Sequence, residues 1–132
     1  MMKSKIFKNF WNYDGQGELK SLIKEEKVFE LRFKSLVIAK LKYQKEIWTF
    51  EYTEEFKNQD EISPLPDFPD KNKVYESEAL FPFFVLRIPS LHQPRIQNVI
   101  KKENIDQNNI IEMLKRFGKD SISNPFRLLL AS

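Results

Sequence analysis

Apolar and polar residues alternate along the first half of the chain in the pattern of β-strands. Three runs have a period of two, are rich in β-branched and aromatic residues and are separated by short polar breaks: 28–33, 36–43 and 47–52. In the third run the aromatic residues share one face: Trp48, Phe50 and Tyr52. We therefore predict three antiparallel strands, joined by hairpins, with one apolar face.

A proline-rich stretch follows the predicted sheet. Thr53 is suited to cap a short helical turn. The segment 62–70, ISPLPDFPD, is expected to be extended, because a residue before proline is pushed out of the helical region. Its apolar residues, Leu65 and Phe68, favour packing over the core. A proline-rich ligand for an aromatic groove is the alternative.

Helical spacing governs the second half of the chain. We predict three helices, each with a capping residue or a proline at its start: 78–87 after Ser77, a second from Pro94 and a third after Asp106. The first helix either tolerates Pro82 or restarts there, with Pro82 in its first turn. The third is the most regular, with apolar residues at positions i, i+3, i+4 and i+7: Ile110, Met113, Leu114 and Phe117. The tail, 122–132, fits either a short helix or a strand.

The most apolar stretch of the chain, LFPFFVLRIPSLHQP at 80–94, ends in a short loop. Most of it is aromatic, aliphatic or proline, which is typical of core. The loop Ser90–Gln93 then stands between Pro89 and Pro94, whose fixed φ angles lower the entropic cost of order. A rigid loop on an aromatic support is suited to present side chains to a partner. We call this stretch, residues 80–94, the corner, and we predict that it is the functional surface.

Composition indicates one globular domain. The chain has 132 residues, of which 41% are hydrophobic and 14% aromatic, and this is enough for a single core. Two of the three glycines mark a break near the start, so we predict an N-terminal extension at 1–27 and a domain at 28–132. Within the extension we expect a short amphipathic helix at 18–27 that lies across the domain. The alternative is that Phe10 and Trp11 anchor a partner.

Charge and cysteine content narrow the class of protein. The 22 basic and 19 acidic residues leave a net charge of +3, which is scattered along the chain. A nucleic-acid-binding domain usually concentrates basic residues on one face, so direct DNA or RNA binding is disfavoured. There is no cysteine and no apolar run of signal-peptide or membrane-spanning length. We expect a cytoplasmic protein that does not enter a membrane.

Residues suited to catalysis are scarce. His92 is the only histidine, so no histidine-rich metal site forms and a Ser-His-Asp arrangement has only that residue to use. Nucleophile-elbow, phosphate-loop and kinase motifs are absent. The carboxylates stand mostly in charged, solvated segments such as 54–55 and 60–61. We predict no enzyme activity, no cofactor and no metal ion.

Three stretches, IWTFEYTEEF, YESEALFPFFVLRIPS and MLKRFGKD, together carry a family resemblance. Across about 28–120 the chain resembles the N-terminal subdomain of HipA-type serine/threonine kinase toxins. That family has paired Phe residues followed by an aliphatic residue and proline, matched here by Phe83, Phe84, Ile88 and Pro89. The resemblance implies an α+β fold: a small curved antiparallel sheet, or partial barrel, covered by C-terminal helices.

The resemblance also implies partners. A stand-alone lobe of this kind is similar to HipS, the antitoxin of three-gene HipBST systems, which docks on a HipT-like kinase and neutralises it while a HipB-like helix-turn-helix repressor completes the set. The implied contact residues are those of the corner, Arg87, Ser90, Leu91, His92 and Gln93, with Phe81, Phe83 and Phe84 as support. His92 stands where the family loop carries a bulky aromatic residue.

Two other functions stay open. In the first, the lobe stabilises the kinase or bridges it to the repressor without blocking activity. In the second, Trp48 and Tyr52 lie on an exposed sheet face and bind a peptide or a single-stranded nucleic acid.

Overall fold

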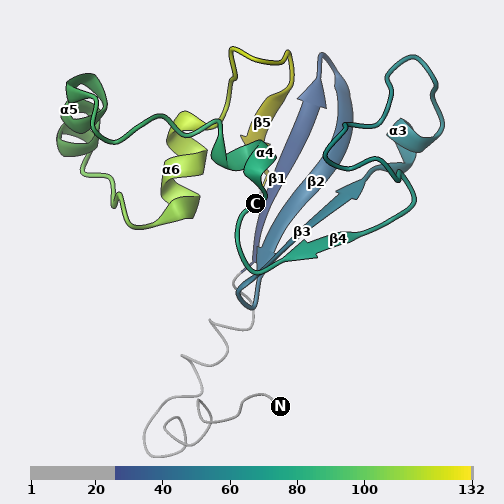
Figure 1. Cartoon of the computed structure of the whole chain (residues 1–132), viewed down its shortest axis with the longest axis horizontal. Helices are drawn as coiled ribbons and strands as arrows, with labels where there is room; N and C mark the ends of the chain where they lie inside the picture. Colours follow the sequence, from purple (N-terminus) through teal and green to yellow (C-terminus); the bar gives the residue numbers. More distant parts are fainter. Residues whose placement is uncertain (1–25, 132) are drawn as a thin grey trace, which may run out of the picture.

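Five antiparallel strands form one open sheet in the computed structural model, which describes residues 26–131 (Figure 1). The strands are β1 (Glu26–Phe33), β2 (Leu36–Gln44), β3 (Ile47–Tyr52), β4 (Tyr75–Ser77) and β5 (Arg127–Leu130), in the spatial order β4-β3-β2-β1-β5. The helices are α3 (Glu54–Lys57), α4 (Pro82–Val85), α5 (Pro94–Glu103) and α6 (Ile110–Phe117). The β1–β2 register shifts between Leu31 and Arg32, where Ile38 of β2 is an extra residue without a partner in β1. The predicted α+β class is confirmed, and the sheet is not closed.

Two tight hairpins join the first three strands, as the alternating pattern predicts. The β1–β2 turn places Lys34 at φ 56°, and the β2–β3 turn places Lys45 and Glu46 at φ 54° and 65°. Two successive left-handed residues are the mark of a type I′ turn, whose twist matches that of the strands it joins. Asn and Gly usually occupy such positions, so these hairpins form without the dipeptide that identifies them in a sequence.

One face of the sheet carries the main core, and the proline-rich arm covers it. Trp48, Phe50 and Tyr52 are all buried. Phe68 of the arm stacks on Phe50 with ring centres 3.8 Å apart. The Tyr52 hydroxyl accepts a hydrogen bond from the backbone N–H of Leu65 at 2.8 Å and donates one to the carbonyl oxygen of Phe68 at 2.6 Å. The arm therefore packs on the core, as predicted.

The prediction of one helix over the whole of 78–87 is wrong, and its alternative, a helix that restarts with Pro82 in its first turn, is confirmed. Ser77, the predicted cap, belongs to the strand β4 (Tyr75–Ser77), which pairs with β3. Within 78–87 only Pro82–Val85 are helical. Phe81, the residue before the helix, has an extended backbone at φ −60° and ψ 140°. The proline after it excludes the helical region for Phe81, so the helix cannot begin earlier. Helix α4 is therefore a single turn.

Helix α6 lies between the sheet and α5 (Figure 1). Its Leu114 is buried in the main core, whereas the neighbouring Met113 is buried in a second, smaller cluster with Ile96 and Ile100 of α5. The C-terminal helices are therefore stacked: α6 covers the sheet, and α5 packs on α6.

Side chains cap the helices at one predicted and one unpredicted position. Thr53 caps α3 as expected, with its Oγ1 accepting a hydrogen bond from the backbone N–H of Phe56 at 3.2 Å. Helix α6 begins later than predicted, because Asn109 rather than Asp106 is its N-cap. The Asn109 side chain accepts a hydrogen bond from the backbone N–H of Ile111 at 3.0 Å.

The tail that the sequence left open forms a strand. Arg127–Leu130 pair with β1, and Leu128 is buried opposite Leu31. The tail is a strand rather than a helix because the edge of β1 that does not face β2 offers it hydrogen-bond partners. Among the helices of residues 26–131, none combines the length and the apolar character needed to cross a membrane.

The predicted extension at 1–27 falls almost wholly outside the described residues. Its candidate anchors, Phe10 and Trp11, lie there too. Of the helix expected at 18–27, only Glu26 and Lys27 are described, and both belong to β1.

Candidate functional site

Aromatic residues around α4 support the predicted contact loop. Phe84 is fully buried, and Phe81 and Phe83 are half-buried against the main core. Phe83 and Phe84 meet edge to face with ring centres 5.0 Å apart, and Phe81 meets Phe68 in the same way at 5.2 Å. Contacts of this geometry add to the stabilisation that burial provides. They fix the position of the chain that enters the loop.

Arg87 is buried, which corrects the expectation that its side chain contacts a partner. Only 6% of the residue is exposed. Its guanidinium donates hydrogen bonds to three carbonyl oxygens, those of Gly118 at 2.6 Å, Lys119 at 3.1 Å and Phe126 at 2.6 Å. A fourth bond, of 3.3 Å, reaches the side-chain oxygen of Asn124. The donors of Arg87 are thus used inside the domain.

Burial of this charge has an electrostatic consequence. It lowers the pKa of Arg87, and the negative charge of Asp120 acts in the opposite direction. A guanidinium nevertheless stays protonated in proteins, so the four hydrogen bonds persist at physiological pH. Arg87 is therefore a positioning residue that ties the corner to the segment 118–126. A single charged residue inside an apolar run is the sequence signal for such a role.

The predicted contact loop is ordered by its own hydrogen bonds. Ser90 Oγ accepts one from the backbone N–H of His92 at 3.2 Å, and the side-chain amide of Gln97 donates one to the carbonyl oxygen of Leu91 at 2.6 Å. Leu91 is half-buried and packs against the cluster between α5 and α6. Ser90, His92 and Gln93 are exposed. The structure therefore presents three of the five predicted residues together, with Leu91 turned partly inward.

Sequence reasoning missed the most exposed apolar side chain of the corner. Leu86 is 82% exposed and the neighbouring Val85 is 41% exposed. Both stand in a run that reads as core, but a single helical turn buries only one side, here Phe84 and Arg87. Pro82 and Pro89 leave room for only a short helix between them. This spacing is the sequence feature that indicates outward-facing aliphatic residues in the run.

The described residues hold no arrangement suited to metal binding, and they hide the aromatic face considered as a binding platform. Within residues 26–131 no three acidic or histidine side chains gather as metal ligands. Trp48 and Tyr52 are each 2% exposed, so the hypothesis that they bind a peptide or nucleic acid on an open sheet face is wrong. Burial raises the pKa of Tyr52 to about 12, in keeping with a hydroxyl enclosed in the core.

Comparison with known proteins gives the family. The model of the family described as HipA N-terminal domain matches residues 29–123, well over half of the chain. The chain belongs to the HipA N-terminal domain family. A solved structure, the N-terminal domain of HipA toxin, has the same fold, with a TM-score of 0.52, 15% sequence identity and coverage of 80% of this chain and 93% of that chain. No curated protein matches the chain.

Membership of the HipA N-terminal domain family relates the chain to the HipA toxin system. The matched residues include α4, the loop, α5 and α6, whereas β5 lies beyond residue 123. At 15% identity the structural likeness shows the fold alone. The contact residues must therefore be argued from the exposure and support of the side chains in this chain.

Proposed function

We propose that this chain is a non-catalytic antitoxin subunit that docks on a HipA-like serine/threonine kinase in the cytoplasm and neutralises it. The observation that carries the proposal is a rigid, exposed corner, made by α4 and the loop after it, in a domain of the HipA N-terminal family. The fold supplies the support, and the exposed side chains supply the contact.

The proposed contact surface combines polar and apolar groups. Ser90, His92 and Gln93 offer donors and acceptors, and Leu86 offers a large aliphatic side chain at 82% exposure. Full burial of a leucine side chain is worth about 1.5–3 kcal/mol, which corresponds to a gain in affinity of roughly 10- to 150-fold. An apolar centre with polar groups around it is the usual anatomy of a protein interface.

The corner is already ordered before a partner arrives. Arg87 joins the corner to the segment 118–126 through four hydrogen bonds. The side-chain amide of Gln97 donates a hydrogen bond to the carbonyl oxygen of Leu91 in the loop. A surface that is ordered in the free protein loses less entropy on binding. This supports direct docking of the corner rather than folding on contact.

The test is growth of cells that express a HipA-like kinase. Co-expression of the full chain alone is expected to restore growth. Restoration that requires a HipB-like repressor as well would favour a lobe that bridges the kinase to the repressor. Failure to restore growth in either case would contradict the antitoxin proposal.

Two variants separate docking from folding. Leu86→Asp and His92→Asp change exposed side chains, so both are expected to fold normally and to weaken kinase binding at least tenfold by calorimetry. Val74→Asp is the matched control, because Val74 is an aliphatic residue of 46% exposure that lies before β4 rather than in the corner. Leu91→Asp is a poorer probe, since Leu91 packs on the α5–α6 cluster. Unchanged affinity of both corner variants would exclude this surface.

A further inference from the structure

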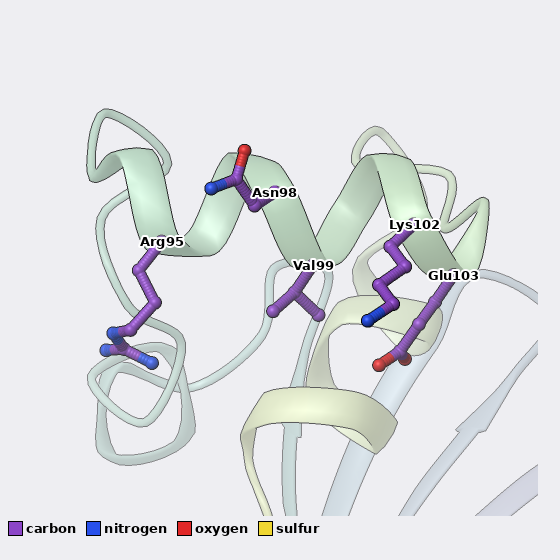
Figure 2. Close-up of a pocket in the computed structure, with 5 residues that line it drawn as sticks. All are labelled: Arg95, Asn98, Val99, Lys102 and Glu103. Atoms are coloured by element: carbon purple, nitrogen blue, oxygen red, sulfur yellow. The ribbon is translucent and has the colours of Figure 1, made fainter.

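Helix α5 carries a cationic face next to the proposed docking corner. Its Ile96 and Ile100 are buried against α6, whereas Arg95 and Lys102 are exposed and Val99 is half-buried. An open hollow runs along the helix and is lined by Arg95, Asn98, Val99, Lys102 and Glu103 (Figure 2). The side chains of Arg95, Val99 and Lys102 extend from the same side of α5 (Figure 2). The helix thus buries one stripe and offers another to solvent.

The two cations of this face, Arg95 and Lys102, form no ion pair within residues 26–131. Glu103 is the one carboxylate that lines the hollow, and Arg116 already binds it through two hydrogen bonds of 2.7 and 3.0 Å. This hydrogen bonding, with a smaller contribution from the charge of Lys102, lowers the pKa of Glu103. In the described part of the chain, neither Arg95 nor Lys102 has a carboxylate at ion-pair distance.

Arg95 occupies a position where its own helix disfavours a cation. It is the second residue of α5, and the first turn contains no acidic residue. The N-terminal end of a helix carries a partial positive charge, so a cation there is repelled. Lys101 and Lys102 have a structural explanation, because cations suit the opposite end of the helix. The helix gives Arg95 no such stabilisation, and a negatively charged partner would supply it.

The geometry of the face favours a protein over a nucleic acid. Arg95 and Lys102 are seven positions apart in the helix, so their backbone positions lie about 10 Å apart along the helix axis. Val99 adds an apolar contact between them. A phosphate backbone would meet only two cations in this hollow, which releases few counterions. Two carboxylates on one face of a partner helix, two turns apart, have the matching spacing.

We propose that α5 packs along an acidic helix of the kinase, whose carboxylates pair with Arg95 and Lys102 while an aliphatic side chain covers Val99. This inference rests on the proposed function and adds a second contact surface to the corner. The two surfaces are continuous in the chain, since Arg95 follows the exposed Gln93 after a single proline. One partner is therefore able to cover the loop and α5 together.

The test measures association and dissociation rates of the full chain with the kinase at low and high salt. Arg95→Glu is the sharpest variant, because a carboxylate in the first turn suits the helix dipole and should leave stability unchanged or raised. We expect it to weaken binding at least fivefold, chiefly by slowing association, and the loss to shrink at high salt. Arg95→Lys should retain most of the affinity. The double variant Arg95→Glu, Lys102→Glu should lose more.

A matched control keeps the change in net charge equal. Lys34→Glu, Lys45→Glu reverses two exposed lysines in the hairpin turns of the sheet, and it should change affinity less than twofold. If the kinase binds the wild type and the α5 double variant equally well, the inference is overturned while the proposed function stands. If the double variant keeps its kinase affinity but loses affinity for a duplex DNA probe, the face serves nucleic acid and the inference is again overturned. A kinase that ignores the wild-type chain overturns both proposals.

Discussion

The guanidinium of Arg87 donates a 2.6 Å hydrogen bond to the carbonyl oxygen of Phe126, which stands 39 residues later in the chain. Phe126 immediately precedes β5, and its ring meets that of Phe33 in β1 edge to face, with centres 5.9 Å apart. One side chain of the corner is thereby linked to the edge of the sheet. The position of the contact loop therefore depends on Phe126 and the strand β5 that follows it.

Replacement of Arg87 by methionine should destabilise the domain. The carbonyl oxygens of Gly118, Lys119 and Phe126 would lose their charged donor, and we expect the free energy of unfolding to fall by roughly 3 kcal/mol. Arg87→Lys should have an intermediate effect, because lysine keeps the charge but not the planar fork of donors. Urea denaturation measures both. A loss below about 0.5 kcal/mol, the lower bound for one ordinary hydrogen bond, would show that these bonds do not hold the corner.

A methyl group at position 118 should also be costly. A Cβ there would lie 2.6 Å from both the carbonyl oxygen and Cδ1 of Leu114. The φ of Gly118 is −89°, which any residue adopts, so the effect is steric rather than conformational. Gly118→Ala is expected to lower stability by about 1–3 kcal/mol. Because shortening the Leu114 side chain removes only one of the two clashes, the double variant Gly118→Ala, Leu114→Val should not regain wild-type stability.

High pH should destabilise the domain through Tyr52. Its pKa is raised from 10.0 to about 12, mainly by burial, so the fold favours the neutral hydroxyl. The contribution is fully present below pH 10 and is lost as the pH rises through about 12. We expect the wild type to lose more stability over this range than Tyr52→Phe, as measured by urea denaturation at each pH. Tyr75→Phe is the control, since its hydroxyl bonds an exposed backbone N–H, that of Asp70. Equal pH dependence of the wild type and Tyr52→Phe would refute the assignment.

The β2–β3 turn offers a stabilising change. Lys45 and Glu46 both adopt left-handed backbone conformations, which strain residues that carry a Cβ. Replacing them with the Asn-Gly pair that suits a type I′ turn should raise stability by roughly 1 kcal/mol. Thermal or urea denaturation tests this, with Gln44→Asn as a control outside the left-handed positions. A destabilised double variant would show that the turn side chains make contacts of greater value.

Sequence reasoning found the elements whose pattern is local. The three first strands follow from alternation, and α5 and α6 follow from helical spacing, because each of these segments is long enough to repeat its period. The strand β4 has only three residues and shows no period, so the sequence favours Ser77 as a helix cap instead. The strand at Arg127–Leu130 could not be predicted from its own sequence, because it forms by pairing with the edge of β1, about 100 residues earlier in the chain. Local pattern was therefore enough for the long elements and not for the short ones.

The candidate site was predicted less completely than the fold. The prolines around Ser90 and Gln93 indicate a surface loop from local sequence alone. The burial of Arg87 depends on carbonyl groups 31 to 39 residues away, which no local pattern reveals. The exposure of Leu86 depends on the shortness of α4, since a longer helix would have buried this aliphatic run on more than one side. Long-range geometry decides both.

Helix α6 lies between two hydrophobic clusters of different size, so the two sides of the domain should differ in the free energy of local opening. The outer cluster has three buried side chains, Ile96, Ile100 and Met113, far fewer than the core under the sheet. Segments with little buried apolar contact open at lower free energy than the core does. The amide protons of α5 should therefore exchange with deuterium well before those of β2, and a partner that clamps α5 should slow that exchange. The helix that we propose meets the kinase is thus expected to open at lower free energy than the sheet and to be stabilised when the kinase binds it.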